Sequence, residues 1–127
     1  MNVVVKACSL VPAALLIAAA SASVFATAEP GLWEIKPGGS EAVKLCVPNT
    51  MALTQFEHRN SKCSRTVIRD NGSSATVHYT CAGGDFGQTD VRLVTPRALS
   101  IQTQGISAGA PFKYTLQARR IGNCQNH

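Results

Sequence analysis

The sequence has few of the residues from which metal sites and enzyme active sites are built. It contains only three histidines, and its cysteines show neither C-x-x-C spacing nor a neighbouring pair of histidines. Zinc sites depend on such spacing, so the sequence predicts no metal site and no cofactor. The chain also lacks a serine in a G-x-S-x-G elbow, the turn that presents the nucleophile of many hydrolases. These absences predict a protein that is not an enzyme.

The best catalytic combination in the sequence is His78 with Asp85 or Asp90, which would act as acid and base in a hydrolase. Nucleophilic catalysis also needs a nucleophile and a group that orients the base. No such residues are evident beside them. We therefore interpret all three as ordinary surface residues.

Apolar residues are unevenly distributed along the sequence, and large apolar and aromatic residues are scarce after position 28. Aromatic residues make up 6% of the sequence and charged residues 15%. Positions 1–28 contain 21 of the 57 apolar residues, which leaves 36 for positions 29–127. This distribution excludes a polytopic membrane protein, a multidomain enzyme and a coiled coil. The apolar residues that remain after position 28 are enough for only a small hydrophobic core.

Positions 1–28 do contain the pattern of a cleavable secretory signal peptide. Lys6 provides the positive charge, Ser9–Ala20 is an uncharged apolar stretch, and Ala26–Ala28 is a small-x-small cleavage site. A membrane anchor would need about 20 apolar residues, whereas this stretch is diluted by alanine and contains a proline. We therefore expect cleavage near Ala28 and a single mature domain over residues 29–127. The expected location is the periplasm or the outside of the cell, with no membrane span after cleavage.

Cleavage would leave an even number of cysteines, which is typical of a disulfide framework in an exported chain. The four that remain are Cys46, Cys63, Cys81 and Cys124. Four cysteines allow three pairings, and the sequence alone does not choose among them. We favour Cys46–Cys63 with Cys81–Cys124, because one bridge would close a short loop and the other would tie the last strand to the sheet. On the loop-entropy model these bridges contribute about 3 and about 4 kcal/mol.

Alternation of apolar and polar residues, the pattern of half-buried strands, dominates the mature chain. The clearest run is Ser74–Cys81, and the preceding Asn71-Gly72 favours a type I′ hairpin turn, in which both turn residues have positive φ. A single short helix is expected over residues 50–58, with Asn49 or Thr50 as its N-cap. The other strand candidates are residues 32–36, 42–47, 66–70, 88–95, 99–104 and 112–119.

Consecutive strands joined by tight turns are antiparallel neighbours, so the sequence predicts a mainly β fold. The expected architecture is an antiparallel meander of about six to seven strands with two disulfides. Each strand has one dry face, and one short helix cannot cover so large a sheet. We therefore expect the sheet to curl onto itself as a barrel or half-barrel.

Three motifs and the order of the cysteines resemble a known family. The motifs are Pro30–Ile35, Tyr79–Cys81 followed by two glycines, and Arg119–Cys124, with one cysteine before the expected helix and another after it. In this order they resemble the bacterial domain-of-unknown-function family numbered 3617. The resemblance implies a small exported protein of the Gram-negative envelope, with a β-rich fold and no assigned activity. Family members often carry methionine-rich central stretches, but the mature chain has only Met51, so no methionine-based copper site is expected.

Two candidate binding sites follow from the predicted strands. The first is a basic patch on the polar face of the sheet, which would favour an anionic partner. Its members are Arg92, Arg97, Lys113 and Arg119. The second is a small apolar cavity inside the barrel. Its lining would be Trp33, Phe56, Tyr79, Phe112 and Tyr114. An ordinary basic surface and a core filled by its own side chains are the simpler interpretations of these two sets.

The sequence therefore predicts a small exported periplasmic protein that acts as a non-enzymatic binding or interaction module of the cell envelope. The alternative is a carrier of small ligands or lipids that uses the barrel interior. The expected partner is an anionic envelope component or another periplasmic protein. Nucleic acid is a poor candidate, because no row of aromatic residues alternates with the basic ones.

Overall fold

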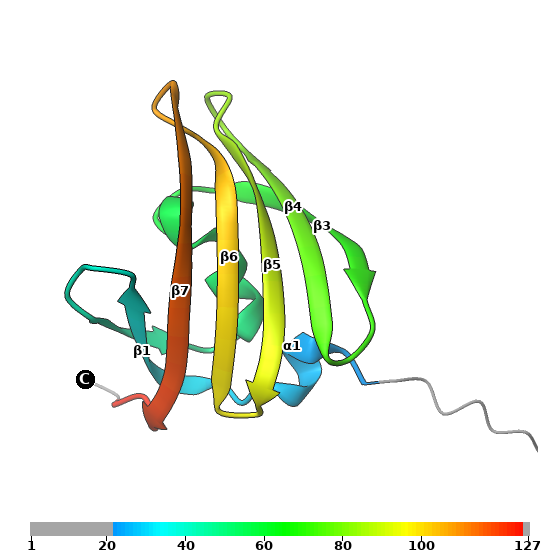
Figure 1. The fold of residues 1–127 in the computed structure, drawn as a ribbon, viewed down its shortest axis with the longest axis vertical. Helices are drawn as coiled ribbons and strands as arrows, with labels where there is room; N and C mark the ends of the chain where they lie inside the picture. The colour runs from blue at the N-terminus through cyan, green and yellow to red at the C-terminus, as the bar shows by residue number, and fades with distance from the viewer. Residues whose placement is uncertain (1–21, 126–127) are drawn as a thin grey trace, which may run out of the picture.

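Seven antiparallel strands form one sheet in a computed structural model of the protein, which describes residues 22–125 (Figure 1). Their order across the sheet is β2-β1-β7-β6-β5-β4-β3. The expected helix is present as the 3₁₀ helix η1, Thr50–His58, which is kinked at Gln55. A second short helix, α1, spans Val24–Thr27. The strands are β1 Gly31–Pro37, β2 Val43–Val47, β3 Cys63–Asp70, β4 Ser74–Cys81, β5 Phe86–Thr95, β6 Ala98–Ser107 and β7 Ala110–Gly122.

The sheet curls around η1 without closing, which confirms the predicted half-barrel. Strands β3 to β7 form a meander. Strand β1 pairs with the other side of β7, and β2 pairs with β1. Within the described chain β2 and β3 are therefore the two edges of the sheet. Figure 1 shows η1 behind β5 and β6, on one face of the sheet. No helix within residues 22–125 is long and apolar enough to cross a membrane.

The core follows the predicted alternation of the strands. In β5 the buried residues alternate with exposed ones, and β6 continues the same pattern. Trp33 is fully buried on β1, and its indole N–H donates to the carbonyl of Glu29 at 2.9 Å. The largest buried apolar side chains of the sheet are Trp33, Tyr79, Ile35, Leu99, Ile101 and Leu116. These side chains fill the concave side of the half-barrel together with η1.

The 3₁₀ helix η1 begins as the sequence suggested. The side chain of Asn49 is the N-cap, since its oxygen accepts the backbone N–H of Met51 at 3.0 Å. The turn between β3 and β4 differs from the prediction. Only Gly72 has positive φ, at 87°, so the expected type I′ turn is wrong. The Asn71 side chain accepts the N–H groups of Ser73 and Ser74 instead, which stabilises a longer turn.

The favoured disulfide pairing is wrong. The structure joins Cys46 to Cys124 and Cys63 to Cys81, with Cα–Cα distances of 5.4 and 4.0 Å. The reason is the strand order. Cys63 and Cys81 lie directly opposite each other in the β3–β4 pair, while the pairing of β1 with both β2 and β7 brings Cys46 close to the end of β7. Linking Cys46 to Cys63 would instead require the two free edges of the sheet to meet.

The observed pairing closes longer loops than the favoured one. The bridges span 78 and 18 residues along the chain. On the loop-entropy model they contribute about 4.5 and about 3 kcal/mol. The first bridge therefore contributes more to stability, and it fixes the N-terminal hairpin to the end of the last strand.

Candidate functional site

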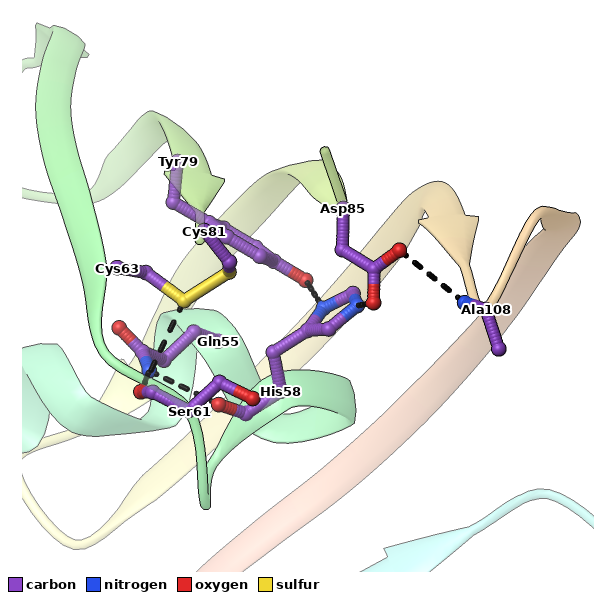
Figure 2. The surroundings of a disulfide bond; sticks show 8 residues. All are labelled: Gln55, His58, Ser61, Cys63, Tyr79, Cys81, Asp85 and Ala108. Carbon is purple, nitrogen blue, oxygen red and sulfur yellow. Dashed lines mark hydrogen bonds and ion pairs between the residues drawn. A yellow bond between two sulfur atoms is a disulfide. The ribbon is translucent and has the colours of Figure 1, made fainter. Parts of the chain in front are cut away.

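A buried histidine at the end of η1 is the centre of a polar network (Figure 2). Its ring nitrogen Nδ1 lies 2.8 Å from the hydroxyl of Tyr79, and Nε2 lies 3.2 Å from a carboxylate oxygen of Asp85. The other oxygen of Asp85 accepts the backbone N–H of Ala108 at 3.1 Å. His58 is 5% exposed and Tyr79 is fully buried. The network thus joins η1 to β4 and to the turns before β5 and before β7.

Local features hold this histidine in place. The amide of Gln55 donates to the carbonyls of His58 and Ser61, so the chain leaves η1 in a fixed direction (Figure 2). Gly87 on β5 leaves room for Tyr79, because a Cβ at that position would overlap the phenol ring. The Cys63–Cys81 bridge then fixes the ends of β3 and β4 beside the network.

The protonation of the network follows from its surroundings. Burial raises the pKa of Tyr79 to about 12, with a further contribution from the charges of Glu57 and Asp85 against the lowering effect of Thr103. The Tyr79 hydroxyl and Nδ1 of His58 share one hydrogen bond, and the imidazole tautomer decides which of them donates. Nε2 of His58 lies within ion-pair distance of Asp85, but it has no hydrogen-bond partner among the described residues. We therefore describe the contact with Asp85 as electrostatic.

A second polar contact holds the other side of η1. The hydroxyl of Tyr114 donates to Glu57 at 2.6 Å. Burial raises the pKa of Tyr114, and the hydrogen bond to Glu57 raises it further. The helix is thus attached to both β4 and β7 through tyrosine hydroxyls. Its opposite face lies toward the edges of the sheet.

A surface groove of about 450 Å³ lies along that other face, between η1 and the edge strands β2 and β3. Leu45, Leu53 and Phe56 form an apolar floor. Three exposed cations, Arg59, Lys62 and Arg65, form the rim. We call this site the basic groove, and its volume falls within the usual range for ligand pockets, about 300–1,000 Å³.

The charge of the basic groove is not neutralised by carboxylates. No aspartate or glutamate is among the described residues that line it, and its three cations form no ion pair within residues 22–125. The guanidinium of Arg59 lies 4.5 Å from the centre of the Phe56 ring and donates to the Phe56 carbonyl. Arg65 donates to the Met51 carbonyl at 3.2 Å. Two of the three cations are therefore oriented by η1 itself.

The structure brings the four residues of the predicted basic patch together only in part. Arg97 pairs with Glu29 at 2.9 Å, and Arg119 lies 3.6 Å from Glu34. Lys113 is six residues from Arg119 on β7, which at about 3.4 Å per residue is about 20 Å along the strand. Arg92 lies between serines on the neighbouring strands. Arg92 aligns through Ser100 with Gln117, two positions from Arg119 on β7. Two of the four charges are thus paired with glutamates, and Lys113 lies apart from Arg119.

The five aromatic residues predicted to line a cavity do not surround a common space. Trp33 and Tyr79 are fully buried in the packed interior. Phe56 lines the basic groove. The rings of Phe112 and Tyr114 contact each other, with centres 5.8 Å apart, and line two other hollows of the sheet. The aromatic residues thus act mainly as core, and only Phe56 contributes to the basic groove.

The residues proposed as a hydrolase pair contact other partners. His78 stacks on Phe86 with ring centres 6.4 Å apart, and Asp90 accepts the hydroxyl of Thr76 at 2.6 Å. The imidazole beside Asp85 is that of His58. Within the described chain no group of three or more His, Cys, Asp or Glu side chains is placed to hold a metal ion.

Sequence reasoning missed the basic groove, although the sequence carried one signal for it. Arg59, Lys62 and Arg65 occur at every third position directly after the expected helix. Their apolar floor gave no local signal, because Leu45 belongs to β2 and comes close only when η1 folds back between the two edges. The partners of His58 likewise come from distant parts of the sequence, β4 and the turn that follows it.

Comparison with known proteins gives a family but no relative of known activity. The chain matches the family model DUF3617, described as a protein of unknown function, over residues 28–124. This match confirms the resemblance carried by the motifs and the cysteines. The comparisons found no match among curated proteins and none among solved structures. Function must therefore be inferred from the geometry of this chain.

Proposed function

Because this chain belongs to DUF3617, a family of proteins of unknown function, we propose its function from its own geometry. It is a small exported binding module of the cell envelope, without catalytic activity, that binds an anionic amphiphile in the basic groove. The observation that carries this proposal is the combination of an apolar floor and three uncompensated cations in one groove. The alternative carrier function loses support, because the interior that it would use is filled by Trp33 and Tyr79.

The lining of the basic groove favours a ligand with one hydrocarbon chain and one anionic group. Apolar surface that a ligand covers on this floor contributes roughly 25 cal/mol per Å². Leu45 is half-buried and offers such surface, whereas Leu53 and Phe56 are 2% and 6% exposed and offer little. The anionic group would meet Arg59, Lys62 and Arg65 at the rim, where charge-assisted hydrogen bonds are stronger than neutral ones. A fatty-acid carboxylate is the simplest ligand with both properties.

The same lining supports the absence of catalysis. A general base or nucleophile must lie within reach of a bound substrate. Among the described lining residues there is no histidine or carboxylate, and both cysteines, Cys46 and Cys63, are held in disulfides. His58 is buried beneath the groove, and Tyr79 cannot reach a ligand, since it has no exposed surface.

Two observations support export. The start of the sequence, positions 1–20, carries the charge and apolar stretch of a secretory signal. The folded chain also depends on two disulfides, which persist mainly in oxidising compartments such as the periplasm. An anionic amphiphile is a component that an envelope protein would meet.

Calorimetric titration of the purified secreted protein with dodecanoate tests the proposal. Dodecyltrimethylammonium has the same chain length and the opposite charge, so it serves as the matched ligand control. Both are used as monomers below their micelle concentrations. We expect binding of dodecanoate that weakens as salt rises, because salt screens exposed charges, and at least tenfold weaker binding of the cation.

A pair of triple variants locates the site. Arg59→Gln with Lys62→Gln and Arg65→Gln should weaken dodecanoate binding at least tenfold, which corresponds to about 1.4 kcal/mol. The control triple variant also removes three positive charges, from the outer face of the sheet and from the turn between β5 and β6. It carries Arg92→Gln, Arg97→Gln and Lys113→Gln. Equal effects of the two triples, or equal binding of the two amphiphiles, would refute a site in the basic groove.

A further inference from the structure

The segment before β1 belongs to the folded core. Val24 has no exposed surface, Ala28 is 2% exposed, and both pack in the same apolar cluster as Trp33. In Figure 1, α1 lies near the end of β5, and the two elements are in contact. Contacts with the core therefore extend back to Ser23, six positions before the start expected from the small-x-small site Ala26–Ala28.

Hydrogen bonds hold this segment to distant parts of the chain. The Ser23 hydroxyl and the Val24 N–H donate to the carboxylate of Asp70 at 2.7 and 3.1 Å. The hydroxyl of Thr50, itself buried, donates to the carbonyl of Phe25 at 2.9 Å. Loss of the segment would therefore leave the Thr50 hydroxyl buried without its acceptor.

We infer that the export peptidase cuts between Ala22 and Ser23, so that Ser23 is the first residue of the mature protein. This inference depends on the proposed export. Ala20-Ser21-Ala22 satisfies the same small-x-small rule as Ala26–Ala28, and it follows directly after the apolar stretch. A cut after Ala28 would remove Val24 and Ala28 from the core. A cut after Ala22 removes neither of them.

The reaction is hydrolysis of one peptide bond. Water adds to the carbonyl carbon of Ala22, and the bond to the nitrogen of Ser23 breaks. The products are a carboxylate on Ala22 and an ammonium group on Ser23. The new positive charge forms on the residue whose hydroxyl already contacts Asp70, so it favours the ionised carboxylate there. Cleavage thus adds an electrostatic attachment to a segment that the fold already holds.

Intact mass measurement of the processed full-length gene product gives the cleavage position directly. The full chain is expressed in a bacterium with a general secretion pathway, and the protein is released from the periplasm for non-reducing mass spectrometry. The expected mass is that of residues 23–127 with two disulfides. A mass starting at Glu29 would overturn the inferred position. An uncut chain retained in the cytoplasm would overturn export itself, so the two failures are distinguishable.

Two single variants separate the competing sites. Ala22→Leu places a large residue at the inferred cut and should leave an uncut precursor that is longer by residues 1–22. Ala26→Leu disrupts only the alternative site, and Ala26 is exposed, so the fold tolerates the change. It should yield a mature chain that still begins at Ser23. Normal processing of Ala22→Leu together with blocked processing of Ala26→Leu would overturn the inference.

Discussion

The hydrogen bond between His58 and Tyr79 gives the sharpest quantitative prediction about the fold. His58→Ala leaves the buried Tyr79 hydroxyl without its hydrogen-bond partner, which costs about 1–3 kcal/mol. It also opens a void under η1, at roughly 24 cal/mol per Å³ of cavity. We expect a total loss of about 3 kcal/mol in the free energy of unfolding. A small domain has about 5–15 kcal/mol in all, so the effect is readily measured.

A double-mutant cycle isolates the hydrogen bond from the void. Tyr79→Phe alone leaves Nδ1 of His58 unpaired and should cost about 1.5 kcal/mol. In the His58→Ala background the same change removes a hydroxyl that has already lost its partner, so it should cost almost nothing. The double variant should therefore lose about 1.5 kcal/mol less than the sum of the single losses. Urea denaturation at pH 7 with disulfides intact measures all four proteins.

An additive result would refute this account of the network. If the two losses in the free energy of unfolding simply add, the 2.8 Å contact contributes nothing to stability, and the histidine acts only by occupying space in the core. Arg92→Ala, on an exposed position of β5, provides the control partner for His58→Ala. Those two changes should add to within about 0.5 kcal/mol, as separated sites do.

Three further predictions concern other parts of the fold. Gly87→Ala should lower the free energy of unfolding by at least about 2 kcal/mol in a denaturation assay, because the new Cβ meets the Tyr79 ring. Thermal melts should show that stability falls as the pH rises from 10 to 12, because the pKa of Tyr79 is raised in the folded state to about 12. The variant Tyr79→Phe should reduce that fall. Val24→Ala should lower the melting temperature by about 5–15 °C, since it removes two buried methyl groups.

The acidic limb of the stability curve depends on Asp70. Burial alone would raise its pKa, but hydrogen bonds from Ser23, Gly72 and Val24 outweigh burial and hold the pKa below its usual value. The folded state therefore favours the ionised carboxylate. Its contribution is present above the unfolded pKa and is lost as the pH falls through the lower folded value. The hydrogen bonds from Ser23 and Val24 also attach the segment before β1 to the end of β3.

The strands were predictable because their information is local. In Ser74–Cys81 and in β5 to β7, the alternation of side chains reports which face is buried, and tight turns join successive strands. The half-barrel followed from the lack of helices to cover such a sheet. The family resemblance added the β-rich fold, and the match over residues 28–124 confirms the family.

The disulfide pairing and the basic groove were not predictable in the same way. The Cys46–Cys124 bridge depends on β1 passing between β2 and β7, a pairing of segments near opposite ends of the described chain for which the sequence carries no local pattern. The basic groove depends on η1 lying between the two edge strands. The Cys63–Cys81 bridge, by contrast, joins the neighbouring strands β3 and β4. The small side chains of Ala26 and Ala28 fit a cleavage rule, which predicts that residues 23–28 belong to the signal. Val24 is nevertheless a core residue, which only its tertiary contacts reveal.

Nuclear magnetic resonance tests the central claim, that the basic groove binds an anionic amphiphile, most directly. Isotope-labelled protein is titrated with dodecanoate, and amide shifts are followed residue by residue. We predict saturable shifts at Leu53, Phe56 and Arg59, with little change at Arg92 and Lys113 on the outer face of the sheet. Shifts confined to the outer face, or no saturable shift in the basic groove, would contradict the proposed function.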